Sequence, residues 1–191
     1  MHHDGVAATG QSSNVFAYLF GKRCAKALEN ANIWRINVSE HSERPSSKPN
    51  PTLEPLEILV GEWNTAGMHP HFPGATLRGR VTFKWLEGGA FLMMHSDVEQ
   101  PGPPSGIAVF GRDDSAGTYS MLYFDERGVS RIYQMSLSGG VWKIWRNSPG
   151  FSQHFTGTFS EDGNTIRGVW ELSRNDSTWE RDLQLTYTRV R

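Results

Sequence analysis

Hydrophobic and polar residues alternate in short runs from Leu59 to Arg189, and turn-forming residues separate one run from the next. Alternation with a period of two is typical of β-strands with one buried face, because successive side chains point to opposite faces of a sheet. Glycine pairs such as Gly88-Gly89 and Gly139-Gly140 supply the positive φ angles that tight hairpins require. The runs predict about ten strands, at 59–67, 76–86, 90–99, 105–112, 117–125, 128–137, 140–147, 151–160, 164–173 and 178–190.

These strands predict an all-β domain at residues 56–191. Because short turns join consecutive strands, we expect an antiparallel up-and-down sheet, and closure into a barrel removes its unpaired edges. Residues 1–55 differ, since they are rich in small polar residues and carry four prolines between positions 39 and 55. This composition predicts an irregular, partly disordered extension, in which residues 15–32 have the spacing of a short helix. The extension is either a lid or partner-binding arm, or a weakly ordered tail.

The composition excludes several classes of partner. The 191 residues carry a formal net charge of -1, which argues against nucleic acid because phosphate-binding surfaces are usually basic. The single cysteine, Cys24, cannot form an intramolecular disulfide. No apolar run approaches the roughly 20 residues of a membrane-spanning helix, and no secretory signal is recognisable. We therefore expect a cytoplasmic protein without a membrane span.

The predicted architecture suggests a binding function, since a barrel of this strand number is wide enough to hold one small ligand. Pockets for such ligands are mostly apolar, with a few polar groups that fix orientation. Arg131 and Arg181 are the cations expected to meet an anionic head group, with Tyr123 and Tyr133 as hydrogen-bonding neighbours. The predicted ligand-binding residues are Met93, His95, Met121, Tyr123, Arg131, Tyr133, Trp145, Trp170 and Arg181.

The segment Leu59-Val60-Gly61-Glu62-Trp63, the ten-strand meander and the closing Tyr187-Thr188-Arg189 resemble lipocalin-like barrels of the calycin superfamily. The resemblance implies that Gly61 and Trp63 lie near a basic residue on the last strand. Trp63 would stack against Arg189 or Arg191 and close one end of the barrel. More narrowly, 78–86, 124–129, 151–159 and 162–171 are similar to an uncharacterised bacterial family of lipocalin-like domains, which implies a fold and a cavity.

A more distant resemblance is to haem-binding barrels similar to nitrobindin, which also open with a Gly-x-Trp strand. Those barrels ligate iron through a histidine near the C-terminal end of the chain. Residues 155–191 contain no histidine here, and His154 lies too early to match. We therefore expect no haem and no other cofactor.

Signatures of catalysis and of metal binding are sparse. No Gly-x-Ser-x-Gly elbow and no phosphate-binding loop is present. His69 and His71 are two residues apart, a spacing that places both on one face of an extended strand, and His95 or Asp97 is the nearest candidate for a third ligand. Two ligands are too few for a stable site, so we interpret both as loop histidines near the barrel mouth and predict no metal.

Three functions follow from this pattern, and binding of a small hydrophobic or amphipathic molecule is the one we favour. The second is a cofactor-independent isomerase or cyclase that uses His95 and a tyrosine as acid and base. The third is a protein-interaction module with a filled barrel. We expect a binding protein more than an enzyme.

Overall fold

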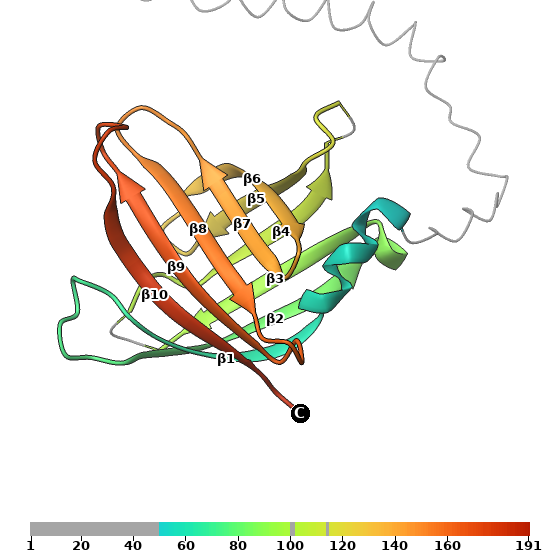
Figure 1. The fold of residues 1–191 in the computed structure, drawn as a ribbon, viewed down its shortest axis with the longest axis horizontal. Helices are drawn as coiled ribbons and strands as arrows, with labels where there is room; N and C mark the ends of the chain where they lie inside the picture. The colour runs from blue at the N-terminus through green and yellow to red at the C-terminus, as the bar shows by residue number, and fades with distance from the viewer. Residues whose placement is uncertain (1–49, 100–101, 114) are drawn as a thin grey trace, which may run out of the picture. The chain divides into compact units, whose positions relative to one another are not determined.

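Ten antiparallel strands form a closed barrel in the computed structural model, which describes residues 50–99, 102–113 and 115–191 (Figure 1). Each strand pairs with its neighbours in sequence, and β1 pairs with β10 to close the sheet. The predicted up-and-down barrel and its ten strands are confirmed. The strands are β1 (Gly61–Met68), β2 (Leu77–Leu86), β3 (Phe91–Val98), β4 (Gly106–Arg112), β5 (Tyr119–Asp125), β6 (Ser130–Ser138), β7 (Val141–Arg146), β8 (Ser152–Phe159), β9 (Thr165–Ser173) and β10 (Glu180–Arg189).

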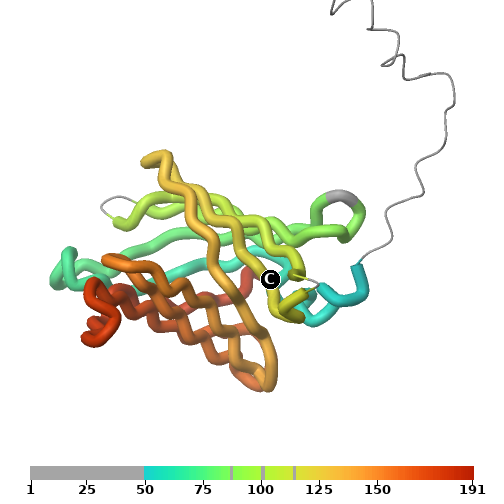
Figure 2. The backbone as a smooth tube through the Cα atoms, turned by 90° about the horizontal axis from the view of Figure 1, so that it is seen from above, coloured from blue at the N-terminus to red at the C-terminus, as the bar shows by residue number. Residues whose placement is uncertain are grey.

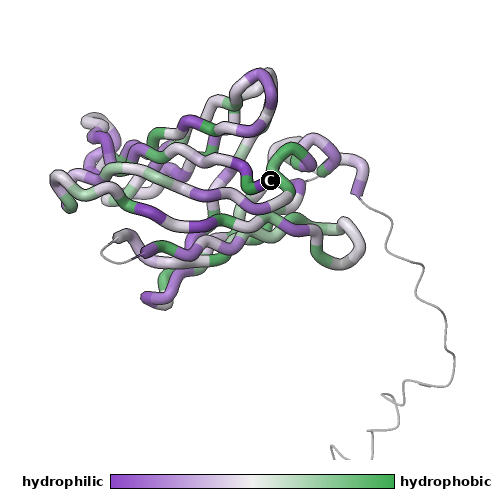
Figure 3. The backbone as a smooth tube through the Cα atoms, turned by 90° about the horizontal axis from the view of Figure 1, so that it is seen from below, coloured by the Kyte–Doolittle hydropathy of each residue, from purple (hydrophilic) through white to green (hydrophobic). Residues whose placement is uncertain are grey.

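The hydrophobic core follows the alternation of the strands. On β2, Val81 and Phe83 are buried, while Arg80 and Lys84, which flank them in the sequence, are exposed. Hydrophobic and hydrophilic segments alternate along several strands of the tube in Figure 3. No helix in the described part of the chain is long and apolar enough to cross a membrane.

A short 3₁₀ helix, η2 (Pro51–Leu59), covers one end of the barrel. Its residues Leu53, Leu56 and Leu59 are fully buried in the barrel core. The Trp85 indole donates to the Glu57 carboxylate at 2.7 Å, and the Tyr119 hydroxyl donates to the Thr52 carbonyl at 3.1 Å. The predicted domain boundary at residue 56 therefore falls inside this helix. The rest of the predicted extension, including the helix at 15–32 and Cys24, lies outside the described residues.

The first and last strands meet beside η2. The guanidinium carbon of Arg189 lies 4.1 Å from the centroid of the Trp63 ring, which is the contact that the resemblance implied. Arg189 also donates to the carbonyls of Val60 and Ile58, each at 2.6 Å. A Cβ on Gly61 would lie 3.1 Å from the Arg189 guanidinium, and Gly61 has a φ of +120°, so glycine suits this position.

Two paired glycines make room for a large ring inside the barrel. Gly157 on β8 and Gly168 on β9 are register partners. A Cβ on Gly157 would lie 2.9 Å, and one on Gly168 2.4 Å, from atoms of the Phe155 ring. The buried Phe155 therefore lies flat across both glycines, where it contributes to the wall of the cavity described next.

Candidate functional site: a cavity in the open end of the barrel

The barrel encloses a cavity of about 390 Å³ at the end opposite η2. Figures 1 and 2 place the β1–β2, β7–β8 and β9–β10 loops at this end and η2 at the other. This volume lies within the usual range of small-molecule pockets. At about 30 Å³ for each water it corresponds to roughly a dozen water-sized groups. The alternative hypothesis of a filled barrel therefore does not fit the structure.

Five of the nine predicted ligand-binding residues line this cavity. Their strands, β5, β6 and β9, keep the alternation that the sequence indicated. The five are Met121, Tyr123, Arg131, Tyr133 and Trp170.

Met93 and His95 lie on the outer face of β3, contrary to the prediction. Their partners decide this, because Phe83 and Trp85 on β2 point inward and pair with Met94 and Leu92. Paired residues share a face of the sheet, so the even-numbered residues of β3 point into the barrel. The His95 side chain is 48% exposed and its Nδ1 lies 3.5 Å from Asp97. The isomerase hypothesis thereby loses its predicted histidine.

Trp145 also points outward, since Trp142 and Ile144 on β7 are the buried residues, and its indole donates to Gln134 at 2.7 Å. Arg181 is exposed because the register of β10 shifts between Arg181 and Leu183. The residue inserted there is Asp182, so Arg181 pairs with the exposed Glu171 rather than continuing the inward row. This β-bulge turns the Asp182 carboxylate into the cavity.

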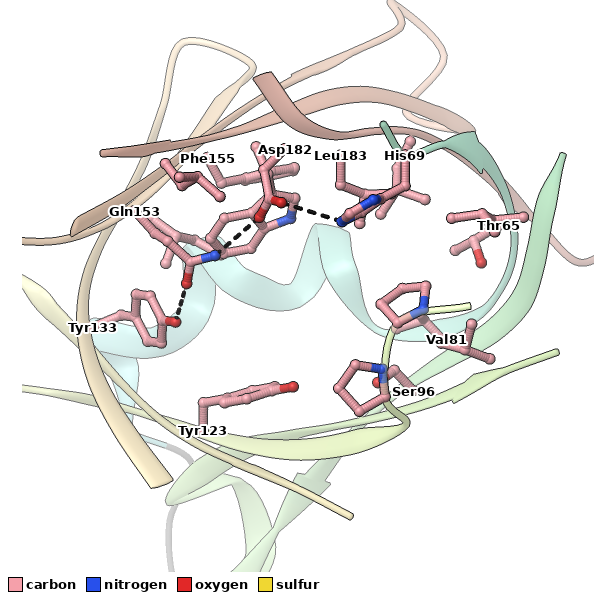
Figure 4. Close-up of a pocket in the computed structure, with 18 of the residues that line it drawn as sticks. Thr65, His69, Val81, Ser96, Tyr123, Tyr133, Gln153, Phe155, Asp182 and Leu183 are labelled. Carbon is pink, nitrogen blue, oxygen red and sulfur yellow. Dashed lines mark hydrogen bonds and ion pairs between the residues drawn. The ribbon is translucent and has the colours of Figure 1, made fainter. Parts of the chain in front are cut away.

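A chain of hydrogen bonds crosses one wall of the cavity (Figure 4). The Tyr133 hydroxyl donates to Gln153 Oε1 at 2.6 Å, and Gln153 Nε2 donates to Asp182 Oδ2 at 3.2 Å. The other oxygen of Asp182, Oδ1, lies 3.2 Å from His69 Nε2. The sequence reasoning missed Gln153 and Asp182. Gln153 could have been found from the sequence, because it is the one amide in an inward row with Phe151 and Phe155. The bulge that turns Asp182 inward leaves no such trace in the sequence.

His69 is oriented by its own loop. Its Nδ1 accepts the backbone N–H of His71 at 3.0 Å, and its ring contacts the rings of His71 and Phe72, with centroids 4.9 and 5.6 Å away. Because Nδ1 is an acceptor, the proton of the neutral ring is on Nε2, which donates it to Asp182. Within the part of the chain that the structure describes, no group of three or more His, Cys, Asp or Glu side chains is arranged to hold a metal ion.

Arg131 brings a positive charge into the cavity. Its guanidinium carbon lies 4.3 Å from the centroid of the Phe151 ring, and Nη1 donates to Gln153 Oε1 over 3.5 Å. No ion pair of Arg131 is found among the described residues. By contrast, Arg127 at the mouth is held by Asp125, with Nη2 2.8 Å from Oδ2.

The tyrosines of the cavity are neutral hydroxyl groups at physiological pH. Burial raises the pKa of Tyr133 above its usual range, although the nearby Arg131 opposes the shift. Burial raises the pKa of Tyr123 further, and the Asp125 carboxylate, which accepts its hydroxyl at 3.2 Å, adds to the effect. Both are therefore hydrogen-bond donors rather than phenolates.

The deeper wall is aromatic. The Trp142 ring packs against Phe83, Phe155 and Tyr187, with ring centroids 5.0 to 6.2 Å apart. Its buried indole N–H has no hydrogen-bond partner in the described part of the molecule. Such a group costs about 1–3 kcal/mol. The cavity thus combines an apolar, aromatic interior with polar and charged groups near the mouth.

Comparison with known proteins supports the fold alone. No family model matches the sequence, and no curated protein matches it. Among solved structures, the crystal structure of Rv2717c from M. tuberculosis is similar, with a TM-score of 0.53 and 16% sequence identity. The match covers 75% of this chain and 100% of that chain. At this identity the likeness concerns the barrel and carries no function.

Proposed function

We propose that this protein binds a small amphipathic molecule in the barrel cavity, with an acidic group of the molecule on Arg131. The observation that carries the proposal is a partly buried guanidinium that lines a cavity with an aromatic interior and has no acidic partner among the described residues. A buried charge is costly unless it is paired. An anionic ligand supplies the missing partner and is held by a charge-assisted hydrogen bond.

The apolar part of the ligand would lie on the inner wall. Met94 and Met121 offer adaptable contacts, and Phe155 and Trp170 form a pair of rings with centroids 5.0 Å apart. Tyr133 stands edge-on to Trp170, with centroids 6.1 Å apart, and so joins the apolar wall to the polar mouth. This arrangement suits a molecule with one polar end and an apolar body.

The charge around the mouth favours an anion. Although the whole chain has a formal net charge of -1, basic residues outnumber acidic residues in the cavity lining. The arginines there are Arg78, Arg127, Arg131 and Arg174, and the acidic residues are Asp97 and Asp182. Clefts lined mainly by one sign of charge concentrate ligands of the opposite sign.

We further propose, on the sequence resemblance stated above, that the chain is a lipocalin-like barrel of the calycin superfamily and acts in the cytoplasm. The closed up-and-down topology and the stacked Trp63 and Arg189 are compatible with that assignment.

Isothermal titration with 2-naphthoate tests the proposal, because this anion has an apolar body and about a dozen non-hydrogen atoms, close to the size of the cavity. The wild-type protein should bind it, and Arg131→Gln should weaken binding about 10- to 100-fold, the usual worth of a hydrogen bond to a charged group. The affinity for the uncharged analogue 2-acetylnaphthalene should fall less than about threefold in the same variant.

Arg181→Gln is the matched control, since Arg181 lies on the outer face of the same barrel. It should leave the affinity for 2-naphthoate unchanged. The proposal is wrong if wild-type protein does not bind 2-naphthoate, or if Arg131→Gln and Arg181→Gln bind it equally well. Thermal melting of each variant establishes that the barrel is folded.

A further inference from the structure

The cavity wall carries a carboxylate as well as a guanidinium, and the two are held apart by one side chain. Asp182 on β10 and Arg131 on β6 both contact Gln153 on β8, which lies midway between them in the barrel order. Gln153 turns its amide oxygen toward Arg131 and its amide nitrogen toward Asp182. The cation and the carboxylate are therefore separated by one amide group and by a hydrogen bond on each side of it, 3.5 Å to Arg131 Nη1 and 3.2 Å to Asp182 Oδ2.

Among the described residues, Asp182 forms no ion pair with a lysine or an arginine, and Arg131 forms none with an aspartate or a glutamate. The side chain of Asp182 is only 18% exposed, and its two contacts come from the uncharged amide of Gln153 and from His69. His69 accepts a backbone N–H on Nδ1, so Nε2 is the ring nitrogen that donates to Asp182. A carboxylate can accept about four hydrogen bonds, so Asp182 retains acceptor capacity toward the cavity.

The backbone is shaped to bring this carboxylate inside. With strict alternation along β10, Arg181 would share the inward face of Leu183 and Asp182 would point outward, whereas the register shift between Arg181 and Leu183 brings Asp182 inside. β-bulges occur often beside binding sites, where they redirect a side chain. A partly buried acid is unfavourable for the empty barrel, which indicates a role in contacting a ligand.

We propose that the ligand is an apolar amino-carboxylate, with its carboxylate on Arg131 and its ammonium group on Asp182. This inference rests on the proposed function and names the ligand class for the same cavity. The ligand repeats the polarity of the Gln153 amide beside it, with an acceptor toward Arg131 and a donor toward Asp182. Its apolar side group lies on the aromatic wall of Phe155 and Trp170.

Three compounds that share the same apolar group allow the contribution of each charged group to binding to be measured separately. L-Phenylalanine carries both groups, 3-phenylpropionate carries only the carboxylate, and phenethylamine carries only the amine. In isothermal titrations with the full chain, we expect phenylalanine to bind at least about tenfold more tightly than either analogue, since each charged group adds one charge-assisted hydrogen bond.

Two variants on opposite sides of Gln153 test the two contacts independently. Asp182→Asn should abolish the preference for phenylalanine over phenylpropionate, while Arg131→Gln should abolish the preference over phenethylamine. Asp182→Glu, which keeps the charge, should retain most of the first preference. Arg181→Gln should change neither ratio, because its side chain lies outside the barrel. If Asp182→Asn does not fold, Arg131→Gln and the three compounds with wild-type protein still decide the question.

The outcomes separate this inference from the proposed function. If phenylpropionate binds as tightly as phenylalanine, or Asp182→Asn leaves their ratio unchanged, the amino-carboxylate class is wrong and an anionic ligand on Arg131 stands. Binding of 2-naphthoate without binding of phenylalanine leads to the same conclusion. Absence of binding by both 2-naphthoate and phenylalanine overturns the proposed function together with the ligand class.

Discussion

Arg189 is held at three points where β10 meets β1. Its guanidinium lies over the Trp63 ring and donates to two carbonyls of the chain entering β1. The Trp63 indole is fixed in turn by donating to the Leu59 carbonyl at 2.8 Å. A planar group with donors in a fixed fork satisfies two carbonyls and an aromatic face at once, which an ammonium group cannot do.

Arg189→Lys should therefore destabilise the barrel although it keeps the charge. We expect the free energy of unfolding, measured by urea denaturation, to fall by about 1–3 kcal/mol, because one carbonyl loses its donor and the stacking is weakened. Arg191→Lys is the matched control, since Arg191 is exposed, and should change stability by less than about 0.5 kcal/mol. Equal effects of the two substitutions would contradict this account of closure.

At the scale of single residues, the sequence identified the cavity only where alternation is undisturbed. Arg131 and Tyr133 are inward because β6 keeps a strict period of two. Asp182 could not be predicted, for a physical reason. One inserted residue moves the side chains that precede it in the strand to the other face of the sheet, and no residue type marks the insertion. His69 was recognised as a mouth histidine, but its contact with Asp182 joins the β1–β2 loop to strand β10, which is far away in the sequence.

The helix η2 closes the end of the barrel that the strands alone leave open. Asn50 caps it by accepting the Thr52 N–H at 3.0 Å, and its backbone N–H donates to the Gly89 carbonyl at the β2–β3 hairpin. Three leucines of η2 are fully buried in the core. The helix thus closes one end of the barrel and leaves the other end open for a ligand.

Leu56→Ala tests how much this helix contributes. The substitution removes a fully buried side chain and should lower the free energy of unfolding by about 2–5 kcal/mol, through lost burial and the hole that remains. Ile58→Ala on the same helix is the control, because Ile58 is 38% exposed, and we expect it to lose less than about 1 kcal/mol. Similar losses for the two variants in urea denaturation would show that η2 is not part of the core.

At the scale of elements, turn signals and alternation predicted all ten strands, but not every face. The face of β2 was clear because Arg80 and Lys84 alternate with Val81 and Phe83. On β3 both faces carry large apolar residues, and Phe91, on the outer face, is 45% exposed. Alternation cannot choose between two such faces, so pairing with β2 decides. The turn helix η3 (Glu87–Gly89) sets that pairing.

The whole barrel is one closed sheet, so the ionisation of groups in any strand acts on the stability of the entire molecule. Groups whose pKa differs between the folded and unfolded chain make that stability depend on pH. Carboxylates at the mouth determine how stability falls at acidic pH, and the buried tyrosines determine how it falls at alkaline pH.

Asp125 contributes to the loss of stability at acidic pH. The hydrogen bonds from the Arg127 side chain hold the pKa of this carboxyl below its usual value, and burial only partly opposes them. A lowered pKa stabilises the folded state above the unfolded value of about 3.9, and this contribution disappears as the pH falls. Asp125→Asn should therefore be less stable than wild type at pH 7, and the difference should shrink at about pH 2.

Urea midpoints at the two pH values measure this difference. Glu161→Gln is the control, because Glu161 is exposed in the β8–β9 turn, and it should match wild type at both. A difference between Asp125→Asn and wild type that persists undiminished at the acidic pH would show that the stabilisation is not ionic.

Tyr187 contributes to the loss of stability at alkaline pH. It lines the cavity on β10 with only 6% of its surface exposed, and burial raises the pKa of its hydroxyl. A raised pKa means that the folded state keeps the proton when the unfolded chain, with a tyrosine pKa of about 10, has lost it. Stability is then complete below that pH and is lost above it, by about 1.4 kcal/mol per such tyrosine at pH 11.

Tyr187→Phe should behave like wild type at pH 8 apart from a small uniform change, but lose about 1.4 kcal/mol less than wild type between pH 8 and pH 11. Urea denaturation at the two pH values gives both losses, and Tyr133, which is also buried, contributes equally to both proteins. If the variant loses as much as wild type, Tyr187 ionises in the folded barrel as readily as in the unfolded chain. Water would then reach the deep aromatic wall, and the cavity would be hydrated there rather than apolar.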